Sequence, residues 1–257
     1  MGKLDGKVGI VTGSGRGLGR AFAIAMAQEG CSVVVNSVDP TRRTADKVAE
    51  EIRKAGGKAI SLIAAVGTRE TADKLVDTAV KNFGSLHILV NNAGITRDQM
   101  LLKMTEEMWD AVLNTHLKGT FLNTQSAVRH MAANKIRGHI INITSGVGLH
   151  GNIGQSNYAA AKGGIISMTK AHSKELVRDG ICVNAVAPLA RTDMFNNVRE
   201  DLRQFMFDVM AKKNVLQRVG EPEDVAPLIV FLASEDSRFI SGQIIAASGN
   251  DGELPWD

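Results

Sequence analysis

Three polar side chains have the types and the spacing of an acid–base site for hydride transfer. Tyr158 and Lys162 stand four residues apart in the stretch NYAAAK, and Ser145 lies thirteen positions before Tyr158. Residues four apart share one face of a helix, which would bring the lysine ammonium within reach of the phenol. Half-ionising a tyrosine near pH ~7 requires about 4 kcal/mol of preferential stabilisation of the phenolate. One cation shifts a pKa by about one to three units, so we expect an oxidised nicotinamide ring to contribute a second positive charge.

The Tyr158–Lys162 spacing by itself also occurs by chance on amphipathic helices. A glycine-rich turn, TGSGRGLG at residues 12–19, adds a second feature that is typical of nicotinamide-dependent enzymes. The turn follows a strand-like run and opens a helix-like segment, the setting in which such glycines let the backbone approach a pyrophosphate. Gly13, Gly17 and Gly19 would provide that approach, and the N–H groups that begin the helix favour an anion. The alternative is a purely structural turn. Ligands of open parallel sheets lie beyond the carboxyl ends of the strands, where all these motifs fall.

The composition is that of a globular protein with a small-molecule ligand. A length of 257 residues, with 44% hydrophobic and 22% charged residues, suits a single domain over residues 1–257. We find no apolar run of the roughly 18 residues that span a membrane and no signal-peptide pattern. Cys31 and Cys182 fit a reducing compartment, so we expect a cytoplasmic protein. A net charge of +3 without an arginine-rich run argues against nucleic acid, and we expect no metal site.

Short apolar runs alternate with longer segments of helical period, which is the pattern of repeated β-α-β units. Seven runs predict strands: KVGIVTG, CSVVVN, KAISLI, LHILVNN, GHIINIT, GICVNAVA and GQIIAA. Helices are expected at residues 18–29, 43–55, 69–83, 106–134, 157–178, 193–212 and 221–233. Because the strand runs are apolar throughout, helices should cover both faces. The sequence therefore predicts a doubly wound, Rossmann-type α/β fold with a seven-stranded, mostly parallel sheet.

The motifs together resemble the short-chain dehydrogenase/reductase family over essentially the whole chain. The matching features are TGSGRGLG, NNAG at residues 91–94, Ser145, YAAAK and Pro188, in order and spacing. The resemblance implies a Rossmann-type domain, usually a homotetramer, that moves a hydride between a nicotinamide cofactor and a carbonyl or alcohol. Within the family the chain is similar to the 3-oxoacyl-ACP reductases and to the 3-hydroxyacyl-CoA dehydrogenase domain of multifunctional enzyme type 2.

The resemblance also implies residue roles. Ser145 would hold the substrate oxygen; the alternative is that it is only a turn residue at the end of a strand. Tyr158 would exchange the proton with the substrate. Lys162 would hold the nicotinamide ribose and lower the pKa of the Tyr158 phenol. Thr192 would meet the carboxamide. The expected cofactor-binding residues are Gly13, Ser14, Arg16, Gly17, Leu18, Gly19, Ser37, Val66, Asn91, Ala93, Gly94, Tyr158, Lys162 and Thr192.

Three positions depart from the family pattern. His116 stands where the family has its fourth catalytic residue, an asparagine, and Asn114 is out of register. A neutral imidazole can accept and donate a hydrogen bond, so His116 either anchors the water that links Lys162 to solvent or is a buried histidine satisfied by backbone. Leu189 and Ala65 replace a glycine and an aspartate of the family. These changes indicate either a different substrate lid or a subunit that has lost its activity.

The residues after the second strand bear on the choice of cofactor. NAD-binding members of the family carry an acidic residue where this chain has Ser37, so no carboxylate would oppose a 2′-phosphate there. Arg16 could meet that phosphate with help from Arg42 or Arg43, or it could be a solvated surface cation. Asp39 is the counterargument, because a shift of one or two residues would restore an NAD-type acid. We expect NADP(H) in preference to NAD(H).

A lid over the substrate is expected at residues 193–213. Its apolar residues suit an acyl chain or a ring, although such residues at helical spacing are usually core: Met194, Phe195, Phe205, Met206, Phe207 and Met210. Its basic residues would meet a CoA phosphate or an acidic carrier protein, or form a solvated face: Arg199, Arg203, Lys212 and Lys213.

The function predicted from these features is NADP(H)-dependent interconversion of a ketone and a secondary alcohol. The favoured substrate is a 3-oxoacyl or 3-hydroxyacyl thioester of ACP or CoA. The alternatives are a hydroxysteroid or ring-alcohol dehydrogenase, and a non-catalytic subunit of a hetero-oligomer.

Overall fold

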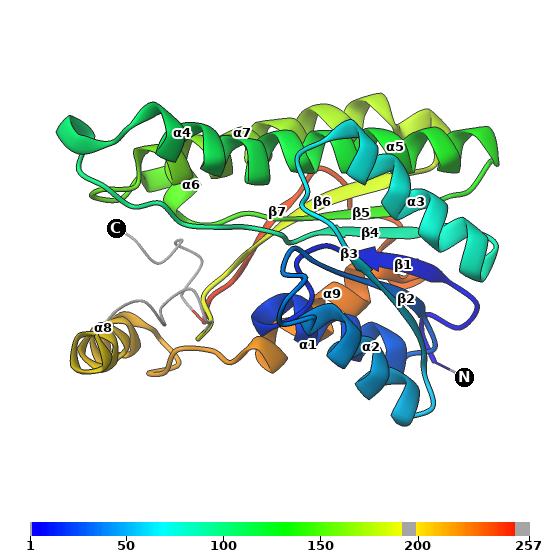
Figure 1. The fold of residues 1–257 in the computed structure, drawn as a ribbon, viewed down its shortest axis with the longest axis horizontal. Helices are drawn as coiled ribbons and strands as arrows, with labels where there is room; N and C mark the ends of the chain where they lie inside the picture. The colour runs from blue at the N-terminus through cyan, green and yellow to red at the C-terminus, as the bar shows by residue number, and fades with distance from the viewer. Residues whose placement is uncertain (1, 192–198, 250–257) are drawn as a thin grey trace.

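Seven parallel strands form the centre of the protein (Figure 1). The computed structural model describes residues 2–191 and 199–249. The sheet has the order β3-β2-β1-β4-β5-β6-β7, and every strand pair in it is parallel. The strands are β1 (Val8–Val11), β2 (Ser32–Ser37), β3 (Lys58–Ile63), β4 (Ile88–Asn91), β5 (His139–Ile143), β6 (Cys182–Pro188) and β7 (Ile244–Ala247). The predicted doubly wound sheet is confirmed.

Helices cover both faces of this sheet (Figure 1). One layer contains α1 (Gly17–Gln28), α2 (Thr44–Lys54) and α9 (Pro222–Ala233), and the other contains α3 (Arg69–Phe83), α4 (Glu106–Leu113), α5 (Gly119–Ala133) and α7 (Ser156–Glu175). The short α6 (Val147–His150) packs against α7, and α8 (Glu200–Lys213) follows β6. Two apolar cores result, one around Phe22 and Ile229 and one around Leu75 and Met131. In the described ranges, no helix is long and apolar enough to cross a bilayer.

Some helices begin or end at other residues than predicted, because the backbone hydrogen-bond pattern changes there while the hydrophobic period continues. The predicted helix at residues 106–134 is present as α4 and α5, but a π-helical turn (Asn114–Lys118) interrupts it. The helix predicted to reach residue 178 ends at Glu175, and a short 3₁₀ turn (Val177–Asp179) follows. The structure adds α6 and a 3₁₀ turn at Leu101–Lys103, which are too short to leave a periodic signature.

The strand order reverses beside β1, which pairs with β2 on one side and β4 on the other. Such a switch point opens a crevice at the carboxyl ends of the strands, where ligands bind. Thr12, directly after β1, closes the base of this crevice because its Oγ1 accepts the N–H groups of Asn92 and Ala93, each at 3.0 Å. The glycine turn and the NNAG segment are therefore held together.

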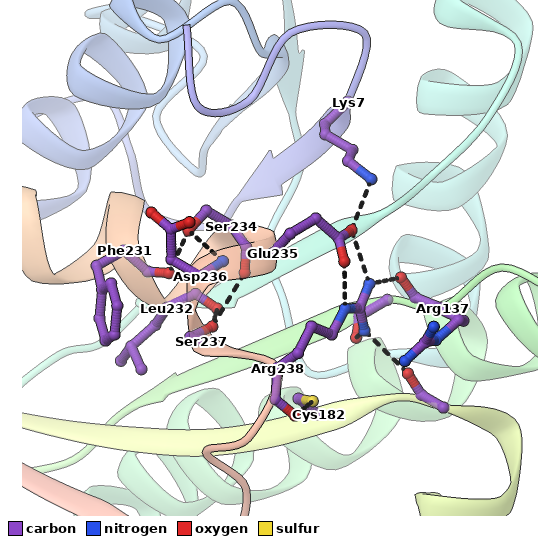
Figure 2. A network of polar contacts seen from close by, with 12 residues as sticks. Lys7, Arg137, Cys182, Phe231, Leu232, Ser234, Glu235, Asp236, Ser237 and Arg238 are labelled. Atoms are coloured by element: carbon purple, nitrogen blue, oxygen red, sulfur yellow. Dashed lines mark hydrogen bonds and ion pairs between the residues drawn. The ribbon is translucent and has the colours of Figure 1, made fainter.

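Arg238 clamps the opposite, amino-terminal end of the sheet (Figure 2). Its guanidinium donates to the backbone carbonyls of Gly180 at 3.0 Å and Gly138 at 3.4 Å, and to that of Arg137. Its Nε donates to the Glu235 carboxylate at 2.8 Å, and Lys7 Nζ donates to the same carboxylate at 3.0 Å. The planar fork of arginine therefore joins the segments that precede β1, β5 and β6.

Replacing Arg238 by Lys should reduce the free energy of unfolding by about 2 kcal/mol, because an ammonium cannot serve three carbonyls and a carboxylate at once. Urea unfolding would measure the loss. Arg20→Lys is the matched control, since Arg20 makes a forked pair with Glu51 on the exposed surface and should lose about 0.5 kcal/mol or less. Equal losses in the two variants would contradict the role given to the clamp.

Candidate active site

Tyr158, Lys162 and Ser145 meet at the carboxyl end of β5. Tyr158 and Lys162 project from α7, and Lys162 Nζ lies 5.5 Å from the centroid of the Tyr158 ring. Ser145 follows the end of β5 by two residues. Burial raises the pKa of the Tyr158 phenol to about 12, against a hydrogen bond with the Ser145 side chain that lowers it. The phenol is therefore protonated at neutral pH in the protein without a ligand.

Lys162 is a buried amine, and none of the described residues places a carboxylate beside it. Its side chain is 3% exposed, and its Nζ donates to the backbone carbonyl of Ile143 at 2.7 Å. Burial lowers the pKa of Lys162 to about 7. The amine thus gains or loses a proton near neutrality, as is common for groups at functional sites.

The π-helical turn between α4 and α5 places His116 against these groups. The His116 and Tyr158 rings stand edge to face with centroids 5.2 Å apart. Gly94 leaves the room for this, because a Cβ there would lie 2.3 Å from His116 Cε1. π turns inside helices are frequent at functional sites. His116 is therefore part of the same cluster as Tyr158 and Lys162.

Among the described residues, only one of the two ring nitrogens of His116 has a hydrogen-bond partner. Its Nε2 lies 2.8 Å from the carbonyl oxygen and 3.0 Å from the backbone nitrogen of Ile95, whereas its buried Nδ1 has no hydrogen-bond partner. Burial, and then the charge of Lys162, lower the pKa of His116 to about 3, so the ring is neutral. Both sequence-based interpretations find support: backbone satisfies Nε2, and Nδ1 remains available for a water molecule.

The glycine turn fits the pyrophosphate of a dinucleotide. Gly13 and Gly17 have φ values of +62° and +52°, which side chains rarely adopt, and no atom lies within 4 Å of a Cβ built on Gly17. Helix α1 begins at Gly17, and Arg16 at its N-cap makes no side-chain capping bond. The first N–H groups of α1 therefore face a position where an anion is favoured.

Ser37, the last residue of β2, and Asp39, in the turn that follows, have different surroundings. Ser37 is only 8% exposed and lies under Gly15, where a Cβ would be 3.1 Å from Ser37 Cβ. The Asp39 carboxylate accepts the N–H groups of Thr41 at 2.9 Å and Arg42 at 3.1 Å. These bonds, with the Arg42 and Arg16 charges, hold the pKa of Asp39 below its usual range. Asp39 is thus occupied in capping its own turn.

Two of the other predicted cofactor residues, Asn91 and Thr192, need a qualification. The Asn91 side chain points into the protein, where its Nδ2 donates to Thr124 and Asn142 at 3.0 Å each, so it can meet a dinucleotide only through its backbone. Val66 packs against the start of α5, 3.3 Å from a Cβ built on Gly119. Thr192 lies outside the described residues, as do Met194 and Phe195 of the expected lid.

Helix α8 is anchored by the residue that departs from the family pattern. Leu189 packs with Phe207 and Val219 in a small apolar cluster, and Arg191 lies over the Phe207 ring at 4.9 Å. Phe205, in contrast, is 65% exposed. Leu189 therefore helps to hold α8 to the segment that follows β6.

The predicted basic residues of α8 are partly neutralised on the helix. Arg199 pairs with Asp201 at 2.5 Å, and Arg203 pairs with Glu200 at 3.5 Å. Lys212 is exposed. These pairs favour a solvated face over a strong anion site.

Sequence reasoning missed three residues that shape the site. Thr12 ties β1 to the NNAG segment, and Gly15 is required because a Cβ there would lie 2.2 Å from Thr44 Oγ1. Asn157 fixes the start of α7, since its Nδ2 donates to the carbonyls of Arg97 and Met108 at 3.0 and 3.2 Å. The sequence offered one indication of their importance, since each lies within or directly beside a recognised motif.

Known proteins similar to this chain fall in one family. A family model described as "short chain dehydrogenase" matches residues 7–203. The 3-oxoacyl-(acyl-carrier-protein) reductase FabG of Thermotoga maritima is 41% identical over 248 residues, covering 96% of this chain and 98% of the relative. A Synechocystis 3-oxoacyl-(acyl-carrier-protein) reductase is 44% identical over 252 residues, covering 97% and 98%. The crystal structure of a Mycobacterium avium short chain dehydrogenase superposes with a TM-score of 0.84 at 39% identity, covering 96% of this chain and 84% of that one.

Replacing Lys162 by Met should stabilise the fold while disrupting the site. The unfolded chain keeps the lysine proton up to its ordinary pKa of 10.5, whereas the folded protein releases it near 7. The burial penalty is therefore complete below pH 7 and disappears as the pH rises to 10.5. Melting curves should show a gain of about 4 °C or more at pH 7 that shrinks towards pH 10.

Lys170→Met, at an exposed position of the same helix, is the control and should change the melting temperature little at either pH. A Lys162→Met variant that melts below the wild type at pH 7 would contradict the assigned burial penalty.

Proposed function

The chain belongs to the short-chain dehydrogenase family and is an oxidoreductase, and from that premise we propose that it reduces 3-oxoacyl thioesters to 3-hydroxyacyl thioesters with NADPH. The carrier of the acyl group would be CoA or an acyl carrier protein. The observation that carries the proposal is the cluster of Ser145, Tyr158 and Lys162 at the carboxyl end of the sheet, on the same side as the uncapped start of α1. The two reductases at 41% and 44% identity support this substrate class.

The protonation states of the cluster suit reduction. When bound, NADPH supplies the hydride that adds to the carbonyl carbon. Tyr158 carries its proton at neutral pH and donates it to the carbonyl oxygen, while Ser145 holds that oxygen through a hydrogen bond. Lys162, at 5.5 Å from the tyrosine ring, stabilises the phenolate that remains and would hold the nicotinamide ribose. Oxidation of the alcohol is the reverse of these steps.

His116 completes the path by which the phenolate regains a proton. Its Nδ1 is buried, neutral and unpartnered, so it can accept a hydrogen bond from a water molecule next to Lys162. In this proposal His116 replaces the family's asparagine as the anchor of that water. The family model and the two reductase relatives favour a catalytic protein over the non-catalytic alternative.

NADPH is favoured over NADH by the charges around the end of β2. Ser37 offers no carboxylate, and Asp39 is held in its own turn by two N–H groups and by Arg42. Arg16, Arg42 and Arg43 are all exposed near this turn. A 2′-phosphate would therefore meet positive charge there.

Kinetics with both cofactors test this preference. We expect kcat/KM to be at least about tenfold higher with NADPH, and Arg16→Ala to remove most of the difference by lowering only the NADPH value. Arg20→Ala, on the next turn of α1, is the control and should leave the ratio unchanged. A wild-type ratio in favour of NADH would refute the proposed selectivity.

Tyr158→Phe tests the reaction itself. With a short 3-oxoacyl-CoA and NADPH, kcat should fall by about a thousandfold, because the general acid is lost. NADPH affinity, measured by the change in its fluorescence on binding, should stay within about threefold because the phenol contributes little to ground-state binding. Cyclic ketones assayed in parallel would identify a ring-alcohol dehydrogenase instead. Turnover retained by the Phe variant would rule out the role given to Tyr158.

A further inference from the structure

Three consecutive residues at the end of β5 each form a hydrogen bond with α7. Asn142 Nδ2 donates to Thr169 Oγ1 at 2.9 Å. The backbone carbonyl of the next residue, Ile143, accepts a hydrogen bond from Lys162 Nζ at 2.7 Å, and Thr144 Oγ1 donates to the Lys162 carbonyl at 3.0 Å. We call these three bonds the β5–α7 ladder. The residue that follows the ladder along the chain is Ser145.

The ladder continues across the sheet as a chain of buried amides. Asn123 Nδ2 on α5 donates to Asn91 Oδ1 at 3.2 Å, and Asn91 Nδ2 donates to Asn142 Oδ1 at 3.0 Å. Thr169 Oγ1 then donates to the Ile165 carbonyl at 2.8 Å. Every bond runs in the same direction, from α5 through β4 and β5 to α7. None of the four side chains is more than 4% exposed.

The fold does not require polar residues at Asn91 and Asn142, because the residues two positions earlier on the same faces of the strands are apolar. Leu89 and Ile140 precede Asn91 and Asn142 by two positions and pack in the core with α3 and α5. Apolar contacts tolerate sliding, whereas a broken hydrogen bond in a low-dielectric interior is costly. A polar layer next to the site therefore fixes one register between strand and helix.

The attachment points determine both the position and the tilt of α7. Lys162 and Thr169 are seven residues apart on the helix, about 10 Å along its axis. Asn142 and Thr144 are two residues apart on the strand, about 7 Å. A helix bound at two points, roughly two turns apart, can neither slide along the strand nor pivot about one contact.

We infer that Asn142, Thr144 and Thr169 are positioning residues, whose hydrogen bonds between β5 and α7 hold Ser145 at reacting distance from Tyr158 and Lys162. The inference rests on the proposed function for the roles of those three residues. The positioning residues touch neither substrate nor cofactor in this scheme. Small displacements of reacting groups reduce turnover strongly, so their effect should exceed that of an ordinary buried hydroxyl.

Thr144→Val and Thr169→Val test the inference, because each removes a hydroxyl and keeps the shape of the side chain. Thr71→Val is the matched control, since Thr71 is a buried threonine on α3 whose Oγ1 lies 3.1 Å from Thr68 Oγ1 and takes no part in the β5–α7 ladder. We expect each ladder variant to lose at least about tenfold in kcat for NADPH-dependent ketone reduction, with the KM for NADPH within about threefold. Thr144→Ser keeps the donor and should restore kcat. Ladder variants that lose no more kcat than Thr71→Val would overturn the inference.

The phenol of Tyr158 gives a second readout that needs no turnover, because it is the one tyrosine in the chain. Its ionisation can be followed by near-ultraviolet difference absorbance in the protein without dinucleotide. In the wild type and Thr71→Val the phenol should titrate well above pH 10, and in the ladder variants nearer to 10, as α7 loosens. If the wild type reduces no ketone, the proposed function fails, and this titration alone decides the role of the ladder: an unchanged titration would refute it.

Discussion

The candidate site depends on the burial of the Lys162 amine at the carboxyl end of the parallel strands. Within the part of the chain that the structure describes, no carboxylate pairs with this amine, and its Nζ bonds the Ile143 carbonyl. Taking an ammonium out of water is costly, which is why its pKa falls to about 7. The surrounding bonds between β5 and α7 must hold the group in place despite that cost. The site therefore carries a desolvation cost that the rest of the well-packed fold offsets.

The two halves of the site come from opposite layers of the protein and meet at the switch point. The glycine turn begins α1 in one layer, whereas Tyr158, Lys162 and His116 belong to helices of the other. Thr12 joins the halves because its Oγ1 accepts hydrogen bonds from the backbone N–H groups of Asn92 and Ala93 in the NNAG segment. Since parallel strands end at one edge, residues 13, 94, 116 and 158 become neighbours although they are far apart in sequence. This convergence places the glycine turn beside the cluster of Tyr158, Lys162 and His116.

The sequence was sufficient for the strands, most helices and the spatial grouping of the motifs, because apolar runs and helical period encode them directly. Other features depend on backbone register or on packing between distant segments, and neither leaves a local pattern. The π turn around His116 looks like uninterrupted helix in the sequence, and the burial of Ser37 under Gly15 depends on how α2 approaches the glycine turn. The sequence leaves Leu189 open between a different substrate lid and a lost activity, because its packing against Phe207 leaves no local pattern. Asn142 and Thr169 were read only as strand and helix residues, since the bond between them spans 27 positions.

The Arg238 clamp has a consequence for biosynthesis. Glu235 joins Arg238 to Lys7, which lies 228 positions earlier, and α9 completes the apolar layer that α1 and α2 begin. While the chain emerges from the ribosome, the face of α1 that packs against α9 stays open until α9 itself has been translated. The nascent protein therefore presents an apolar face throughout that interval, during which chaperones can bind it.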